Sequence, residues 1–272
     1  MQIGVINSLT RDGKCFDHVQ HFGLKVCQLV SWDMSLATRQ LAEVVKKESR
    51  RTGVRVCAVW AGVPGPAEWN FVKGPSTLGL VPEEFRAERV KALKKWADFA
   101  EVIGTKAIIT HCGFIPENPG DPEFAGVVRA IRDVATYCKK KKLQFWFETG
   151  QETPVTLLRT IERVGTGNLG INLDPANLIL YGKGNPIDSL DVFGKYVTNV
   201  HVKDGFYPTT GDNLGMEARV GDGKVNFPEF MKKLISIGFK GELIIEREIS
   251  GDQQIKDIGD TVKYLKKYKG TV

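Results

Sequence analysis

Four residues with side chains suited to metal binding stand at the ends of apolar runs in the second half of the chain: Glu148, Asp174, His201 and Glu246. Three carboxylates and one imidazole brought together repel one another and lose hydration at a high cost unless a cation neutralises them. Oxygen-rich ligation with one nitrogen favours Mn²⁺, with Mg²⁺, Co²⁺ or Zn²⁺ as alternatives. The sequence therefore predicts a divalent-metal site, provided that the four runs are neighbouring strands.

Each of these residues also has a simpler interpretation when it is taken alone. A single glutamate at a strand end is more often a salt-bridge partner, and a single histidine is more often structural. Four such residues on consecutive strands are harder to explain in that way. Glu248 shares a face with Glu246 and is an alternative ligand, but Glu246 is preferred because it follows the apolar run directly.

The elements that position these residues follow from apolar periodicity, in which runs of period 2 alternate with segments of period 3.6. The expected strands are 3–7, 25–30, 54–60, 106–111, 143–148, 170–174, 198–203 and 242–246. The expected helices are 16–22, 36–52, 83–103, 122–141, a helix opening at Pro154, 186–196, 227–237 and 253–268, and the long loops are 61–82 and 204–226. Eight strand-then-helix units without a composition break predict one α/β domain over 1–272, a closed (β/α)₈ TIM barrel.

The alternation within the strands predicts which side chains reach the mouth of the barrel. Phe145 and Phe147 share one face of their strand, while Trp146 and Glu148 share the other. The apolar residues should face the helices and the polar ones the mouth, where TIM barrels have their active sites. His111 ends the fourth strand and is expected at the same place.

Composition and charge argue against several classes of protein. Much of the net charge of +6 lies in 139–142 and 263–270, near predicted helix C-termini where cations are favoured, so no nucleic acid partner is expected. Five scattered cysteines without CxxC spacing argue against a disulfide framework or a thiolate zinc site. With no membrane-length apolar run and no N-terminal signal pattern, we expect a cytoplasmic protein without a membrane partner.

Six segments, in order along nearly the whole chain, resemble those of the xylose isomerase-like TIM barrels. This superfamily of sugar-phosphate isomerases and epimerases also includes endonuclease IV, of AP endonuclease family 2. The segments are THCGFIPE (110–117), FETG (147–150), NLDPANL (172–178), NVHVKDG (199–205), VGDGKVNF (220–227) and IIEREI (244–249). Their combination is specific for the superfamily and much less specific for the substrate.

The resemblance implies a metal held by Glu148, Asp174, His201 and Glu246, with the two glutamates as acid and base on opposite faces of a sugar. It implies an isomerase or epimerase that acts on a ketose or aldose sugar or sugar phosphate through a metal-stabilised enediolate. A homodimer or homotetramer is also implied. The alternatives are a superfamily lyase, such as a keto-inositol or dehydroshikimate-type dehydratase, and a barrel that binds sugars without catalysis.

Five further residues are candidates for substrate binding: Trp60, His111, Asn177, Lys203 and Arg219. Asn177 stands where many relatives have a histidine, which weakens the transfer of substrate contacts from them. Lys203 shares the inward face of His201 and is expected to bind a sugar oxygen or to neutralise a carboxylate. Arg219 is open to a second interpretation, as one partner of a loop salt bridge. Only four histidines are present, so a three-zinc nuclease is not expected.

Two loops carry weaker signals. Trp60 precedes a loop with Trp69 and Phe71, whose aromatic surface would cover a sugar; packing at the rim is the alternative. Gly221 and Gly223 stand in the loop after the seventh strand, where their backbone N–H groups would bind a phosphate, although a plain turn is the simpler interpretation.

Overall fold

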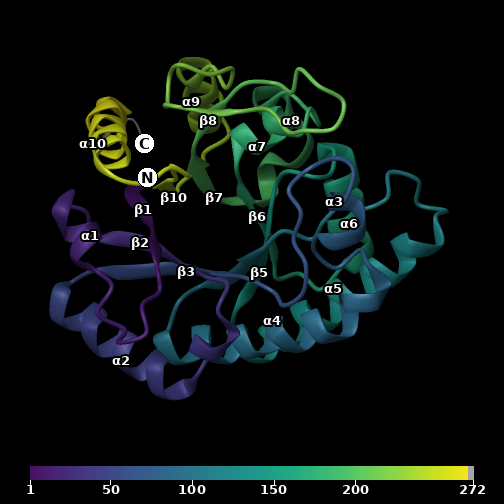
Figure 1. Cartoon of the computed structure of the whole chain (residues 1–272), viewed down its shortest axis with the longest axis horizontal. Coiled ribbons are helices and arrows are strands. Elements are labelled where there is room, and N and C mark those ends of the chain that lie inside the picture. The colour runs from purple at the N-terminus through teal and green to yellow at the C-terminus, as the bar shows by residue number, and fades with distance from the viewer. Residues whose placement is uncertain (269–272) are drawn as a thin grey trace.

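The computed structural model describes residues 1–268, so the last four residues of the predicted 1–272 domain lie outside the described residues. Eight parallel strands close into a barrel in the order β1-β10-β7-β6-β5-β4-β3-β2. The helices lie outside this barrel (Figure 1). The prediction of a single-domain α/β TIM barrel is confirmed.

The strand bounds agree with the predicted ones to within a few residues. The barrel strands are β1 Gln2–Ser8, β2 Val26–Ser31, β3 Arg55–Ala61, β4 Ala107–Thr110, β5 Gln144–Glu148, β6 Leu169–Leu173, β7 Val197–Val202 and β10 Glu242–Ile245. A separate antiparallel pair consists of β8 Asp204–Gly205 and β9 Glu217–Ala218.

Residues 1–268 contain ten α-helices and three 3-10 helices. The α-helices are α1 Asp17–His21, α2 Arg39–Thr52, α3 Gly74–Thr77, α4 Glu83–Ile103, α5 Pro122–Lys140, α6 Pro154–Val164, α7 Pro175–Leu180, α8 Pro186–Phe193, α9 Phe227–Ser236 and α10 Asp252–Leu265. The 3-10 helices are η1 Met34–Leu36, η2 Gly194–Tyr196 and η3 Lys266–Tyr268. None of these helices has the length and apolar character of a membrane span.

Three short elements lie where the sequence predicts only loops. Helix α3 interrupts the first long loop, and the β8–β9 pair interrupts the second. Helix α7 follows β6 directly and begins at Pro175, a position where the missing N–H of proline costs nothing. The Asp174 carboxylate caps it, because Oδ1 accepts the N–H of Asn177 at 2.9 Å.

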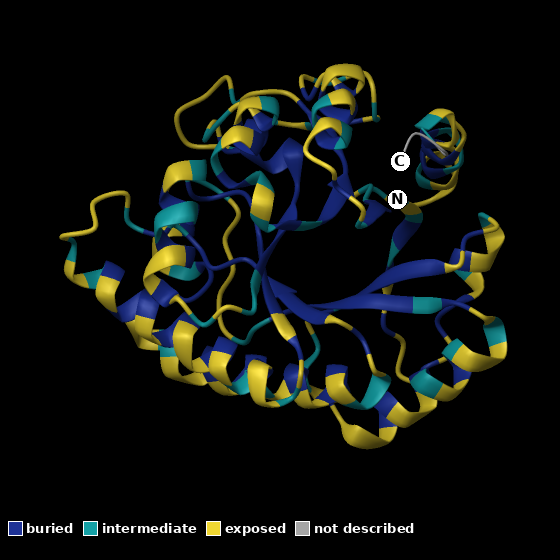
Figure 2. Ribbon diagram, turned by 180° about the vertical axis from the view of Figure 1, so that it is seen from behind, coloured by how far each residue is buried: buried dark blue, intermediate teal, exposed yellow. Residues whose placement is uncertain are grey.

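Two apolar clusters confirm the predicted alternation of faces. Trp146 packs inside the barrel with residues such as Cys57, Ile109 and Ile244. Phe145 and Phe147 belong to the larger cluster between the strands and the helices. Figure 2 shows the consequence, because the strands are buried while the helices expose their outer faces to solvent. All five cysteines are free and buried.

A buried arginine fastens the loop between β3 and α4. Arg89, in α4, is 1% exposed, and its guanidinium donates to the carbonyls of Pro64, Pro66 and Gly79 at 2.8–3.0 Å. Gly79 in turn packs against the segment after β4, where Leu80 N donates to Cys112 O at 2.9 Å. Gly79 has φ +68°, and an added Cβ would overlap the backbone of Cys112 and Gly113.

A matched pair of variants separates the two effects that an alanine at Gly79 would have on stability, the close packing of its Cβ and the positive φ. Gly53, at the end of α2, also has φ +68° but has no heavy atom within 4 Å of its Cβ position. We expect Gly53→Ala to lower the unfolding free energy by about 1–2 kcal/mol, the cost of the left-handed conformation. Gly79→Ala should lower it by at least about 1–3 kcal/mol more, through overpacking. Equal losses in urea unfolding would contradict the packing assignment.

Candidate active site

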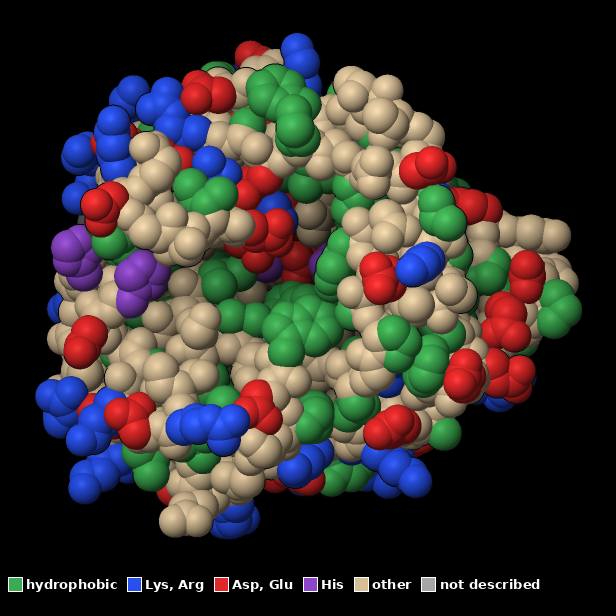
Figure 3. All heavy atoms as spheres, viewed as in Figure 1, with side chains coloured by type: hydrophobic (Ala, Val, Ile, Leu, Met, Phe, Trp, Pro, Cys, Tyr) green, Lys and Arg blue, Asp and Glu red, His purple; other side chains and the backbone are tan. Residues whose placement is uncertain are grey.

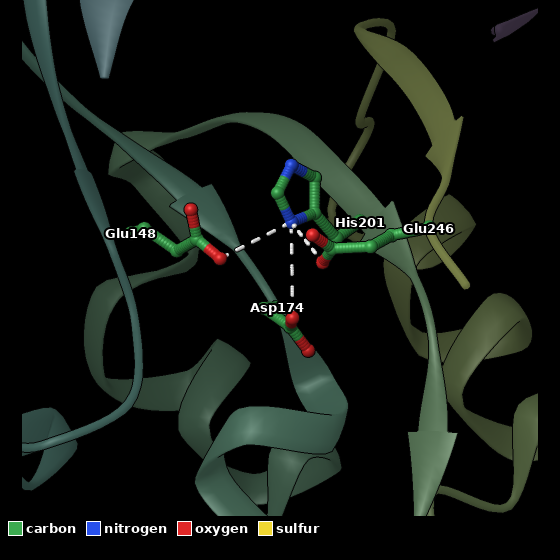
Figure 4. Close-up of side chains that lie close together, drawn as sticks. All are labelled: Glu148, Asp174, His201 and Glu246. Atoms are coloured by element: carbon green, nitrogen blue, oxygen red, sulfur yellow. Dashed lines mark ion pairs between the residues drawn. The ribbon is translucent and has the colours of Figure 1, made fainter. Parts of the chain in front are cut away.

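The four predicted metal ligands meet at the C-terminal mouth of the barrel. Glu148 ends β5, Asp174 follows β6, His201 lies in β7 and Glu246 follows β10. These strands are neighbours in the barrel, in the order β10-β7-β6-β5. One ligand atom from each residue lies within 4.8 Å of the others. Figure 4 shows the three carboxylates arranged around the imidazole, with Glu148 and Glu246 on opposite sides.

The distances within this cluster centre on one imidazole nitrogen. His201 Nδ1 lies 3.0 Å from Glu246 Oε2, 3.3 Å from Glu148 Oε1 and 3.7 Å from Asp174 Oδ2. Among the described residues, no hydrogen bond reaches His201 Nδ1, Asp174 Oδ2 or Glu246 Oε2. Buried polar atoms without partners are costly, and a bound cation would satisfy all three at once. The residues therefore fit a divalent metal.

The second nitrogen of His201 supports the same conclusion. Its Nε2 lies 2.8 Å from the Gln28 side-chain oxygen and 3.0 Å from Asn172 Nδ2, in a buried layer beneath the cluster. The Gln28 oxygen can only accept a hydrogen bond, whereas the more distant Asn172 Nδ2 can only donate one; the shorter contact, to Gln28, favours a proton on Nε2. That tautomer leaves an electron pair on Nδ1, which faces the carboxylates and is available to a metal.

Burial and neighbouring charges shift the pKa values in the cluster. Burial alone would lower the pKa of His201, but Glu246 and Glu148 raise it well above its usual value. Burial raises the pKa of Glu246 to about 7, against the opposing effects of Lys203 and His201. Burial would also raise the pKa of Asp174, but Lys203 and His201 lower it below its usual value. A metal must displace protons from the first two groups, so its affinity should increase with pH.

A buried lysine compensates part of the negative charge. Lys203 Nζ lies 2.8 Å from Glu248 Oε1, and 3.5 Å from both Asp174 Oδ2 and Glu246 Oε2. Burial would lower the pKa of Lys203, but these carboxylates raise it well above its usual value. Its ammonium also donates to Asn177 Oδ1 at 3.3 Å, and Asn177 Nδ2 donates to Glu148 Oε1 at 3.3 Å. Lys203 and Asn177 thus tie the two ends of the cluster together.

A cavity of about 420 Å³ opens above the cluster. Figure 3 shows a hollow in this face, with acidic side chains beside hydrophobic ones. Glu148 and Glu246 line the cavity, whereas Asp174 and His201 do not. Its other lining residues are Ile6, Val30, Trp32, Trp60, Trp69, His111, Asn177, Leu180, Tyr181, Lys203, Leu214 and Glu248. The two glutamates are therefore the ligands that a molecule in the cavity would meet.

Tryptophans form one wall of this cavity. Trp60 Nε1 donates a hydrogen bond to Glu148 Oε2, which fixes the carboxylate from the side of β3. The Trp60 ring lies 5.0 Å from that of Trp32, and the Trp32 ring lies 6.0 Å from that of Trp69, measured between ring centroids. His111 completes this wall, with Nε2 3.5 Å from Glu148 Oε1. Burial lowers the pKa of His111, which favours its neutral form.

The structure brings four of the five predicted substrate-binding residues to the cavity and leaves one apart. Trp60, His111, Asn177 and Lys203 line it, but Arg219 does not. The Arg219 guanidinium is half-exposed and pairs with the carboxylate of Asp222 at 3.0 Å. Arg219 therefore forms the loop salt bridge that was the second interpretation of this residue.

Among the residues of the site that the sequence analysis missed, two carried a signal in the sequence. Trp32 directly follows β2, and the rule that led to Glu148 would have placed it at the mouth. Gln28 is a polar residue on the inward face of an otherwise apolar strand, which indicates a buried hydrogen-bonding role. Leu214 also lines the cavity, but it comes from a long loop and carries no comparable signal.

The glycine loop after β7 binds a carboxylate of the protein itself. Asp204 is 1% exposed, and its Oδ2 accepts the N–H groups of Gly221 and Gly223 at 3.0 and 3.1 Å. Its Oδ1 accepts those of Gly205 and Val225 at 2.9 and 3.0 Å. The loop is an anion nest, and Asp204 fills it.

A family model described as a xylose isomerase-like TIM barrel matches residues 16–268 of the chain. A xylose isomerase domain protein from Planctomyces limnophilus has a crystal structure with TM-score 0.92 and 35% identity, over 98% of this chain and 96% of that one. The apo 3-keto-D-glucoside 4-epimerase of E. coli shares the fold alone, with TM-score 0.71 and 17% identity over 98% and 99% of the two chains.

Similarity to curated proteins is weaker. An inosose dehydratase from Geobacillus kaustophilus is 25% identical over 191 residues, which cover 59% of this chain and 62% of that protein. The chain spans less than two thirds of the length of the curated relatives it matches. The solved structures thus show the fold over 98% of the chain, and the curated relatives add a dehydratase to the similar proteins.

The metal assignment can be tested by calorimetric titration of Mn²⁺ into chelator-treated protein. We expect one site, with an affinity that increases with pH as Glu246 and His201 release protons. Asp174→Asn should weaken binding by about 100-fold or more, because it removes one of the four ligands. Glu248→Gln, which alters a carboxylate near the cluster but outside it, should bind Mn²⁺ nearly as wild type does. Unchanged affinity in Asp174→Asn would exclude this site.

A second buried carboxyl group lies close to the site without lining the cavity. Glu152, four residues after Glu148, is 2% exposed, and its Oε2 has no hydrogen-bond partner among the described residues. Burial raises the pKa of Glu152 from 4.5 to about 8. The folded state therefore holds a proton on Glu152 at neutral pH, which the unfolded chain releases.

This proton predicts a pH-dependent effect of Glu152→Gln on stability. Wild type keeps the full contribution of the neutral carboxyl below pH 4.5 and loses it as the pH rises towards 8. The unfolding free energy of the variant relative to that of wild type should therefore increase, by on the order of a few kcal/mol, as the pH rises from 5 to 8.5. Urea unfolding with chelator present measures this difference, and Glu162→Gln, at an exposed position, is the control. A gain independent of pH would contradict the assignment.

Proposed function

Because the chain belongs to the xylose isomerase-like TIM barrel family, we propose that it is a divalent-metal-dependent isomerase or epimerase of a sugar or sugar phosphate. One observation carries the proposal: Glu148 and Glu246 both line the cavity, and their carboxylates lie on opposite sides of His201 Nδ1 (Figure 4). Two carboxylates on either side of one substrate are what a proton transfer between its carbon atoms requires. The sugar epimerases among the structurally similar proteins support this reading.

The proposed cofactor is Mn²⁺, held by Glu148, Asp174, His201 and Glu246, with Mg²⁺, Co²⁺ or Zn²⁺ as alternatives. When bound, the cation polarises the substrate carbonyl and lowers the energy of the enediolate that forms on proton loss. A cytoplasmic location and a homodimer or homotetramer stay predictions.

In the proposed reaction Glu148 removes the proton α to the carbonyl. Its two oxygens are held by Trp60 and Asn177, so the carboxylate is aimed before the substrate arrives. Glu246 returns a proton, either to the adjacent carbon, giving an isomer, or to the opposite face, giving an epimer.

A dehydratase is the second candidate, supported by Lys203 and by the similarity to an inosose dehydratase. In this reaction Glu148 removes the same proton, and a hydroxyl on the next carbon leaves as water. That hydroxyl needs a proton donor, and the Lys203 ammonium lines the cavity 3.5 Å from Glu246 Oε2. The product then lacks one water, whereas an isomer or epimer keeps the mass of the substrate.

The proposal predicts carbon-bound deuterium when the metal-loaded protein turns over a ketose in deuterated water. We expect Glu148→Gln and Glu246→Gln each to lower kcat by about 10²–10⁴-fold, because each removes one proton-transfer group. Both should keep the fold, since glutamine is nearly isosteric, and Glu162→Gln controls for a lost surface charge. Mass spectrometry separates deuterated isomers from dehydrated products.

Three outcomes would contradict the assignment. Wild-type kcat in Glu148→Gln would remove this residue from the chemistry. Loss of water from the product would favour the dehydratase. Metal-dependent sugar binding without exchange or product, across a panel of ketoses and ketose phosphates, would favour a non-catalytic binding barrel.

A further inference from the structure

We infer that the substrate of this cavity is an uncharged sugar without a phosphate group. The inference rests on the proposed function, which leaves phosphorylation open. It follows from the charges that line the cavity, from the two groups that would otherwise bind a phosphate, and from the aromatic wall.

The cavity offers no free cation to a phosphate. Among its lining residues Lys203 is the one lysine or arginine, and Glu248, Glu246 and Asp174 already surround its ammonium. Together with Glu148, these residues carry four negative charges. Lys203 and a divalent metal carry three positive charges, so one negative charge is left over. A phosphate dianion would therefore lose its hydration and meet a field of its own sign.

Two groups in the loop after β7 that are suited to phosphate lie outside the cavity lining and already bind carboxylates of the protein. The backbone nest of Gly221 and Gly223 holds the buried carboxylate of Asp204. The Arg219 guanidinium binds Asp222 through two nitrogens, at 3.0 and 3.2 Å. A phosphate would have to displace a carboxylate of the protein at either place, and the exchange would expose a second anion.

The wall that faces the cavity suits a neutral sugar instead. Trp32 and Trp69 are 45% and 40% exposed at the mouth, although both rings are large and apolar. With Trp60 they form a continuous aromatic surface beside the two glutamates. The C–H face of a sugar ring would cover this surface, while its hydroxyl groups meet the glutamates, Asn177 and Lys203.

Matched pairs of substrates test the inference by turnover. Each of fructose, tagatose, psicose and sorbose is compared with its own 1- and 6-phosphates, with carbon-bound deuterium as the readout. We expect a neutral ketose to exceed its esters in kcat/KM by about tenfold or more, which corresponds to about 1.4 kcal/mol. Preference for an ester would overturn the inference while leaving the proposed reaction intact.

If no substrate pair is turned over, that result counts against the proposed function alone. A quenching experiment then tests the inference independently of turnover. Tryptophan fluorescence of Mg²⁺-loaded protein is quenched at low ionic strength with iodide and with caesium. The difference between wild type and Trp69→Phe isolates the signal from the mouth, and Trp32→Phe is a second variant at the same wall. Because iodide is intrinsically the more efficient quencher of indole, each quenching constant is divided by that of free N-acetyltryptophanamide. We expect the normalised constant of this signal to be larger for caesium than for iodide, and salt to reduce the contrast. A normalised constant for iodide that equals or exceeds that for caesium would overturn the inference.

Discussion

Uncompensated negative charge, buried at the mouth of the barrel, is the constraint on which the site depends. Glu148, Asp174 and Glu246 converge within a few ångströms, and one ammonium, on Lys203, does not balance them. Such a cluster is unfavourable in a folded protein unless something of opposite charge completes it. Among the described residues, buried atoms without a hydrogen-bond partner mark the place, because Asp174 Oδ2, His201 Nδ1 and Glu246 Oε2 all point to one centre.

The parallel barrel is what makes this convergence possible. Each ligand comes from a different strand, and parallel strands bring their carboxyl ends to the same rim. The pleat then turns alternate side chains inward, so Trp146 fills the interior two residues before Glu148 reaches the mouth. Beneath the cluster, Gln28 and Asn172 hold His201 from the opposite side, which fixes the direction in which the imidazole presents its electron pair.

The fold and the convergence of the ligands were predictable from sequence because both depend on local periodicity. Apolar alternation marks the strands, and a strand end marks a position such as that of Glu148 or His201. The residues around the four ligands were harder to predict, because their positions depend on contacts between distant segments. Nothing in the sequence near Arg219 shows whether its guanidinium turns to the cavity or to Asp222. Likewise, the glycine loop signals an anion, but only the folded chain identifies that anion as Asp204.

Asp174 divides its two oxygens between different tasks. Oδ1 holds the first turn of α7 through Asn177 N, while Oδ2 faces the cluster. Helix α7 carries Asn177 and Leu180 to the cavity wall, so under the proposed function one carboxylate would serve both the metal and the wall that faces a sugar. Binding of the metal and binding of the sugar would then be linked thermodynamically. Such linkage is reciprocal: a sugar that tightens the hold on the ion must itself be held more tightly when the ion is present.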